Sequence, residues 1–144
     1  MKNRAVTGAR GKKLTVDESL IALFIGAMDA NGHVAPGELE RAHHLIWSTR
    51  RFRQRDGDEV NRVISAMRER IQSSDAQTVL GVAVRALPAR LREPAFAVLA
   101  DLLLADGRLD VEERSFLRRV GTDLQIAAAT QRRIVDVVLL KNQL

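Results

Sequence analysis

Two short segments of the sequence carry the residue types that bind hard cations. Residues 30–34 read Ala-Asn-Gly-His-Val and residues 105–109 read Ala-Asp-Gly-Arg-Leu, and a glutamate, Glu38 or Glu113, follows each glycine after six positions. Carboxylate and amide oxygens are the ligands that Ca²⁺, Mg²⁺ and Mn²⁺ prefer. The two segments are 75 positions apart, and their similarity is the first indication of an internal repeat.

Each segment has the outline of an EF-hand loop, in which a glycine permits the turn and the later glutamate chelates with both oxygens. The first position of such a loop is acidic, but here it is Ala27 in one copy and Leu102 in the other. One segment alone therefore supplies too few oxygens for Ca²⁺, and we do not expect a true EF-hand.

The same residues have a purely structural explanation. Gly32 and Gly107 would end one helix in the left-handed conformation, and Asp110 with Glu113 would cap the next helix. This explanation leaves acidic residues at helix C-termini, where each opposes the helix dipole at a cost of up to about 1 kcal/mol. If a pseudo-two-fold axis brings the segments together, their oxygens form one cluster. The metal hypothesis assigns as ligands Asp29, Asn31, Glu38, Asp106, Asp110 and Glu113.

Helices are expected to position these segments, because capping residues, prolines and apolar residues at helical spacing recur along the chain. Aromatic residues make up only 3% of the chain and no segment alternates with a two-residue period, so no strand is expected. The seven predicted helices run from a cap at Thr15 to about Ala30, from Pro36 to about Arg51, from a cap at Asp56 or Asp58, from a cap at Ser74 to Pro88, over about 89–105, from a cap at Asp110, and over about 127–141, with the basic segment 50–58 as a loop.

The repeat extends beyond the two turns. At the same offset, Leu23 and Phe24 match Val98 and Leu99, and apolar residues of the third predicted helix match those of the seventh. Helices one to three therefore correspond to helices five to seven, with the fourth as connector. The sequence predicts an all-α compact bundle with an internal pseudo-two-fold, in which the first and fifth helices, the most apolar, lie side by side at the centre.

The positive charge of the chain belongs to its N-terminal segment. The formal net charge is +5, and residues 1–13 contain five basic residues and no acidic one, which leaves 18 of each sign in the other 131 residues. We expect residues 1–13 to form a flexible basic tail on a helical domain of residues 14–144. The balanced domain makes nucleic acid an unexpected partner.

The segment Arg50–Arg55, with Phe52 inside it, is the main alternative binding surface. Clustered arginines beside an aromatic ring can contact phosphates or stack a base. Together with the tail they define the alternative function, a nucleic-acid or acidic-membrane accessory protein. The solvated C-terminus of a helix explains the same arginines, because cations there favour the dipole, and no reading helix is recognisable.

Several classes are excluded or disfavoured by composition. The chain has no cysteine, so it has no disulfide, thiolate zinc site or cysteine nucleophile. Its three histidines form no HExxH motif, and neither a nucleophile elbow nor a phosphate-binding loop is present. Asp17 and Glu18 interrupt the pattern of a signal peptide, and Asp29 ends the apolar run before it could span a membrane. We expect a soluble, cytoplasmic protein that is not an enzyme.

The repeated turns resemble those of the tellurite-resistance TerB-like domains. The second motif, LLLADGRLDVEE, matches well, whereas the first, AMDANGHVAPGE, has Asn31 where the family usually has Asp and Ala35 where it usually has a capping Ser or Asp. The resemblance covers about residues 15–142. It implies a bundle of about seven helices, no established enzymatic activity, an acidic cluster for divalent metal, and stress responses to tellurite and other insults, sometimes near membranes, with protein partners unknown. The acidic role carries over to Asp106, Asp110 and Glu113, and in the first copy cleanly only to Glu38.

Overall fold

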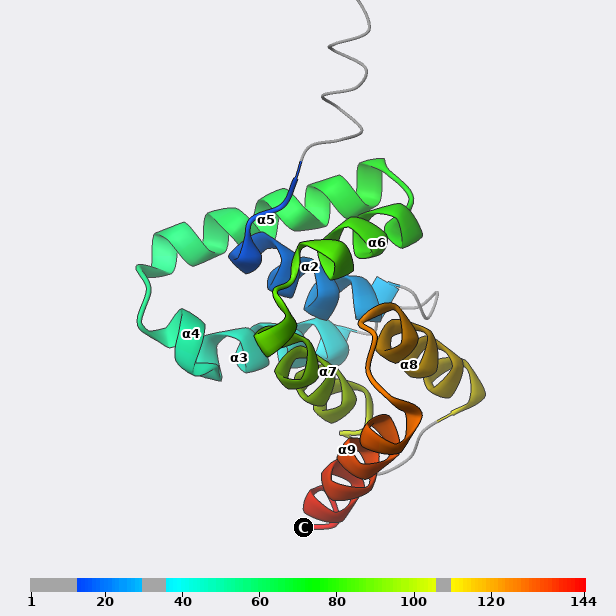
Figure 1. Cartoon of the computed structure of the whole chain (residues 1–144). Coiled ribbons are helices and arrows are strands. Elements are labelled where there is room, and N and C mark those ends of the chain that lie inside the picture. The colour runs from blue at the N-terminus through cyan, green and yellow to red at the C-terminus, as the bar shows by residue number, and fades with distance from the viewer. Residues whose placement is uncertain (1–12, 30–35, 106–109) are drawn as a thin grey trace, which may run out of the picture.

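The computed structural model describes residues 13–29, 36–105 and 110–144, and for residues 29 and 36–39 it describes the backbone alone. These segments form eight helices and no strand (Figure 1): α2 (Val16–Asp29), α3 (Pro36–Ser48), α4 (Arg50–Arg53), α5 (Gly57–Ser73), α6 (Ala76–Ala86), α7 (Ala89–Leu103), α8 (Val111–Asp123) and α9 (Ala128–Lys141). None of these helices is long and apolar enough to cross a membrane. The predicted all-α fold class is confirmed.

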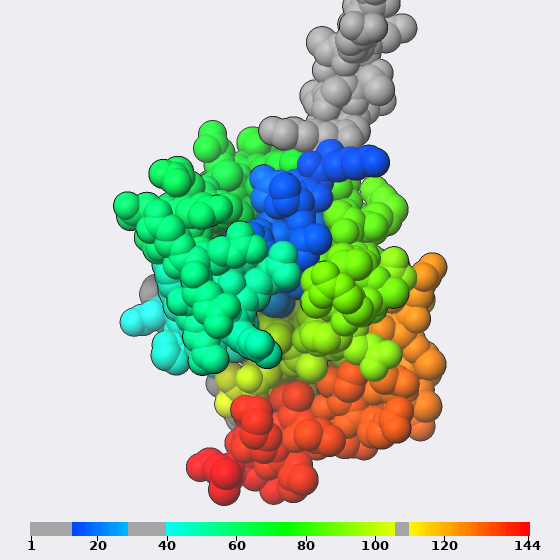
Figure 2. Space-filling view, turned by 60° about the vertical axis from the view of Figure 1, so that its left-hand side comes forward, coloured from blue at the N-terminus to red at the C-terminus, as the bar shows by residue number. Residues whose placement is uncertain are grey.

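The first predicted helix, α2, lies at the centre of the bundle. Its predicted capping box is present: the Glu18 N–H donates to Thr15 Oγ1 at 3.1 Å, and the Thr15 N–H donates to Glu18 Oε1 at 2.8 Å. Every residue from Ser19 to Met28 is buried, and α2 packs against α3, α5, α6 and α7. Figure 2 shows the start of α2, in blue, at the surface between green segments. A helix that is apolar all round must be enclosed in this way to be stable.

The close approach of α6 to α2 depends on a glycine. A Cβ atom at Gly26 would lie 2.7 Å from Leu80 Cδ2, which is buried at the interface. Because Gly26 has no side chain, the two helices pack with Leu80 directly over the α2 backbone. This contact places α6, the connector between the predicted repeats, on the central helix rather than at the edge of the bundle.

The second half of the chain is organised around α7. This helix packs on α8 and α9 and also contacts α2, so the first and fifth predicted helices are neighbours as expected. The neighbours of α2 include α3 and α5, whereas those of α7 include α8 and α9, which is the correspondence that the repeat implies. The pseudo-two-fold symmetry itself stays a prediction.

The basic segment 50–58 is not the plain loop that the sequence predicted, because it contains α4. The second predicted helix ends at Ser48 instead of Arg51, and Thr49 is extended with φ −69° and ψ 141°. The hydroxyls of Ser48 and Thr49 donate to carbonyl oxygens three residues earlier, and such bonds compete with continuation of the helix. Phe52 is 2% exposed, and its burial holds the next turn against the core.

A second boundary also differs from prediction. The N-cap of α6 is Asp75 and not Ser74, and Asp75 Oδ1 accepts a hydrogen bond from the Gln77 N–H at 3.4 Å. Ser74 is instead the extended residue that ends α5. The predicted cap at Asp56 is confirmed, because its carboxylate accepts a bond from the Asp58 N–H.

A Schellman motif sets the turn between α8 and α9. The Ile126 N–H donates to the Gly121 carbonyl at 3.0 Å, and the Gln125 N–H donates to the Thr122 carbonyl at 2.9 Å. Gln125 has φ 62°, the left-handed conformation that this motif requires and that glycine usually provides. Ile126 is buried, so an apolar contact accompanies the turn and fixes where α9 begins.

Candidate functional site

Only two of the six predicted metal ligands, Asp110 and Glu113, have side chains that the structure describes. Asn31 and Asp106 lie outside the described residues. Asp29 ends α2 and Glu38 lies in the first turn of α3, but their side chains are also outside the described part. Among the side chains that are described, no group of three or more His, Asp or Glu residues is placed to hold a metal ion. The six-residue ligand set therefore stays a prediction.

Asp110 and Glu113 form the capping box that the sequence predicted. The Glu113 N–H donates to Asp110 Oδ1 at 2.7 Å, and the Asp110 N–H donates to Glu113 Oε1 at 3.3 Å. The positive end of the α8 dipole favours both carboxylates. A carboxylate has two oxygens and about four lone pairs, so the capping bond that Asp110 accepts does not use up the capacity of that carboxylate.

The helices that frame the two turns adjoin one another. The first turn joins α2 to α3 and the second joins α7 to α8. Within each pair the two helices pack together, and α7 contacts both α2 and α3. The two turn-bearing pairs are therefore in contact through their helices, whereas the distance between the two turns stays a prediction.

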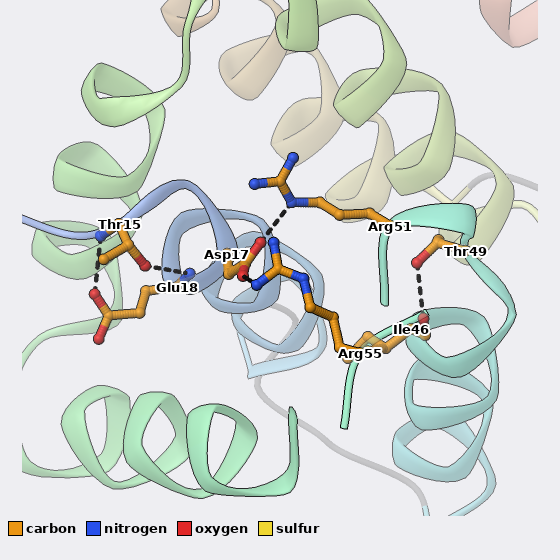
Figure 3. A network of polar contacts seen from close by, with 7 residues as sticks. All are labelled: Thr15, Asp17, Glu18, Ile46, Thr49, Arg51 and Arg55. Atoms are coloured by element: carbon orange, nitrogen blue, oxygen red, sulfur yellow. Dashed lines mark hydrogen bonds and ion pairs between the residues drawn. The ribbon is translucent and has the colours of Figure 1, made fainter. Parts of the chain in front are cut away.

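A second polar cluster, which the sequence did not predict, joins Asp17 to Arg51 and Arg55 (Figure 3). Arg51 Nε donates to Asp17 Oδ1 at 2.5 Å, and Arg55 Nη1 lies 2.9 Å from Asp17 Oδ2. The Asp17 side chain is only 20% exposed. One carboxylate therefore fastens α4 and the residues after it to the start of α2.

This cluster changes the interpretation of the basic segment Arg50–Arg55. Two of its four arginines are paired with Asp17, and Phe52 is buried in the core instead of being available to stack on a base. A phosphate-binding surface with an aromatic platform needs both groups exposed. Arg51, Phe52 and Arg55 thus hold this segment against the rest of the protein. The tail, which is the other part of the alternative binding surface, lies outside the described residues up to residue 12.

Fold and turns together define a small all-α bundle with an acidic cap after its second turn. Residues 17–135 of the 144 match the family model described as tellurite resistance protein TerB. The chain belongs to this family, as the resemblance of its two turns predicted. No curated protein and no solved structure matches the chain.

Proposed function

We propose that this member of the tellurite-resistance TerB family is a non-enzymatic module that binds a divalent cation through its two acidic turns. The observation that carries the proposal is the capping box of Asp110 and Glu113, which places two carboxylates in the first turn of α8, directly after the second acidic turn. The first copy repeats the glutamate at the same register, at Glu38. Binding would take place in the cytoplasm, with Ca²⁺, Mg²⁺ or Mn²⁺ as the cation.

The proposed ligand chemistry explains why two turns are needed. All six candidate side chains offer oxygen atoms, and Ca²⁺ takes six to eight oxygens whereas one turn supplies about half of that number. An ion held by both turns would tie the pair α2 and α3 to the pair α7 and α8. Binding of the ion would then change the packing of one helix pair on the other. A protein partner or a membrane-proximal complex could recognise this change, so the module would act as a sensor of the cation.

The test is thermal and chemical unfolding with and without each cation. A ligand that binds only the folded state at about 100 times its dissociation constant adds about 2.7 kcal/mol to the free energy of unfolding. In the double variant Asp110→Asn with Glu113→Gln, amide oxygens still accept the capping bonds. This variant should keep its metal-free stability within about 1 kcal/mol and lose the added stabilisation.

The start of α5 offers a matched control. Asp56 and Glu59 occupy the N-cap and third helical positions of α5, the same positions as Asp110 and Glu113 in α8, but they belong to neither of the two repeated turns. The double variant Asp56→Asn with Glu59→Gln should respond to the cation as the original chain does. No change in unfolding at millimolar Ca²⁺, Mg²⁺ or Mn²⁺, or an equal loss in both double variants, would refute the metal proposal.

A further inference from the structure

A groove with an apolar floor and basic walls lies between α7, α8 and α9. Its volume is about 630 Å³, within the range of about 300–1,000 Å³ that is typical of small-molecule sites. The floor includes Phe96 and Leu117, which are 1% and 2% exposed, and the partly buried Leu139. Figure 2 shows the orange and red atoms of α8 and α9 adjoining at one end of the molecule.

The walls of the groove carry an excess of positive charge. Arg114 and Arg118 are four residues apart on α8, and Arg132 lines the groove from α9. All three are exposed, and none has an ion-pair partner within the described part of the chain. Asp136 is the one acidic residue of the lining. Like charges around an apolar floor favour an anion with an apolar body over any neutral or cationic molecule.

The start of α9 adds to the same preference. This helix has no side-chain cap and no acidic residue in its first turn, and its first-turn residues Ala128 and Gln131 line the groove. The positive end of a helix dipole without a compensating carboxylate favours an anionic group nearby. The dipole of α9 and the three arginines therefore both favour a negatively charged ligand in the groove.

The dimensions favour a single extended chain over a helix. At 1.5 Å per residue, the lining extends about 12 Å along α8, from Arg114 to Thr122, and about 16 Å along α9, from Ala128 to Leu139. Packed helices lie about 8–10 Å apart, whereas a helix with its side chains is about 10–12 Å wide. An acyl chain can enter such a groove, but a partner helix would have to lie on top of it.

We propose that this groove binds a free fatty-acid anion, with the acyl chain on the floor formed by Phe96 and Leu117 and the carboxylate paired to the arginines. Arginine suits this role because its planar fork donates two parallel hydrogen bonds to a carboxylate. The site shares no residue with the proposed metal ligands, so either proposal can fail without the other.

The first test is calorimetric titration of the full chain with dodecanoate and octanoate, each below its micellar concentration. We expect one dodecanoate per chain. Octanoate has four methylenes fewer, and because each buried methylene contributes up to about 0.8 kcal/mol, it should bind at least about 10-fold more weakly. Dodecyltrimethylammonium also has a chain of twelve carbons but carries the opposite charge, and it should not compete.

Paired variants then locate the site. Arg118→Ala with Arg132→Ala should weaken dodecanoate binding by about 10-fold, since two charge-assisted contacts are lost. Arg62→Ala with Arg85→Ala removes the same charge from exposed positions on α5 and α6 and should leave the affinity unchanged. Circular dichroism confirms that each variant is folded.

Three outcomes would overturn the proposal. Equal weakening in both double variants would mean a long-range effect of net charge. Equal affinity for dodecanoate and octanoate would mean that the floor is not used. Binding to vesicles of anionic phospholipid without binding to dodecanoate would mean that the basic walls contact a membrane surface rather than a free fatty acid.

Discussion

At the scale of single residues, Asp17 makes the interactions that were hardest to predict from the sequence. It lies in the first turn of α2, where its negative charge interacts favourably with the helix dipole. Its carboxylate also forms ion pairs with both Arg51 and Arg55. The capping pair Thr15 and Glu18 could be predicted, because capping depends on a local spacing of three residues. The arginine pairs could not, because 34 residues separate Asp17 from Arg51 and no periodicity relates them.

Asp17→Asn is expected to lower the free energy of unfolding by about 1 kcal/mol. The loss combines two partly exposed ion pairs with the weaker interaction of an amide with the helix dipole. Chemical denaturation measures it, and the effect should shrink at high salt because exposed ion pairs are screened. The matched control is Asp58→Asn, since Asp58 holds the same second position in α5 and no ion pair is found for its side chain in the described structure.

A double-mutant cycle separates the ion pair from the dipole. If Asp17 and Arg51 interact, the cost of Asp17→Asn with Arg51→Ala falls short of the sum of the single costs by about 0.5 kcal/mol or more. Strict additivity, together with equal costs for Asp17→Asn and Asp58→Asn, would mean that the pairs seen in Figure 3 add nothing to stability.

At the scale of elements, the sequence predicted helices well and their ends less well. Long amphipathic or apolar segments carry their own periodic signal, and seven such segments became α2, α3 and α5 to α9. The four-residue α4 is too short for such a signal, and what holds it is the burial of Phe52. The sequence also does not predict the Schellman motif after α8. The left-handed position of this motif is usually a glycine, but here it is Gln125.

The contact between α8 and α9 gives a prediction with an unusual sign. Alanine normally stabilises a helix interior relative to glycine by about 1 kcal/mol. A Cβ at Gly121, however, would overlap the side-chain amide of Gln131, whose Nε2 donates to the Ile126 carbonyl at 2.8 Å. Gly121→Ala should therefore lower the free energy of unfolding by about 1 kcal/mol in spite of its better propensity.

Gly81 in α6 is the matched control, because a Cβ there would meet only the end of the Arg85 side chain, at 3.5 Å. Gly81→Ala should stabilise the protein by about 0.5–1 kcal/mol. Adding Gln131→Ala to Gly121→Ala removes the overlap and should recover part of the loss. If both glycine variants shift the unfolding transition in the same direction, helix propensity and not the approach of α9 decides the effect.

At the scale of the whole molecule, the candidate metal site shows where sequence reasoning stops. Each turn was recognised from its own residues, and the cap at Asp110 and Glu113 is confirmed. Convergence of the two turns is a different matter, because it depends on how the helix pairs dock through side chains spread over the whole core. The offset of 75 residues predicts equivalent positions in two repeats, but equivalence does not fix the distance between them.

The division into tail and domain leads to the last prediction. The buried core begins at Leu14, which is 6% exposed, and extends to Val138, whereas residues 1–12 contain four of the five basic residues of the predicted tail and no acidic one. Deleting residues 1–12 should change the free energy of unfolding by less than about 0.5 kcal/mol. Leu14→Ala in the full chain should cost about 2 kcal/mol or more, because it removes a buried side chain.

The same deletion tests the alternative function, in which the protein binds nucleic acid. Affinity for duplex DNA that depends on phosphate contacts falls steeply with salt, and if the tail makes those contacts, the deletion should abolish any such affinity. Because Arg51 and Arg55 are already paired with Asp17, we expect no salt-sensitive binding to survive. DNA binding that persists without residues 1–12, and that Arg50→Ala with Arg53→Ala then removes, would instead make the segment Arg50–Arg55 a nucleic-acid surface.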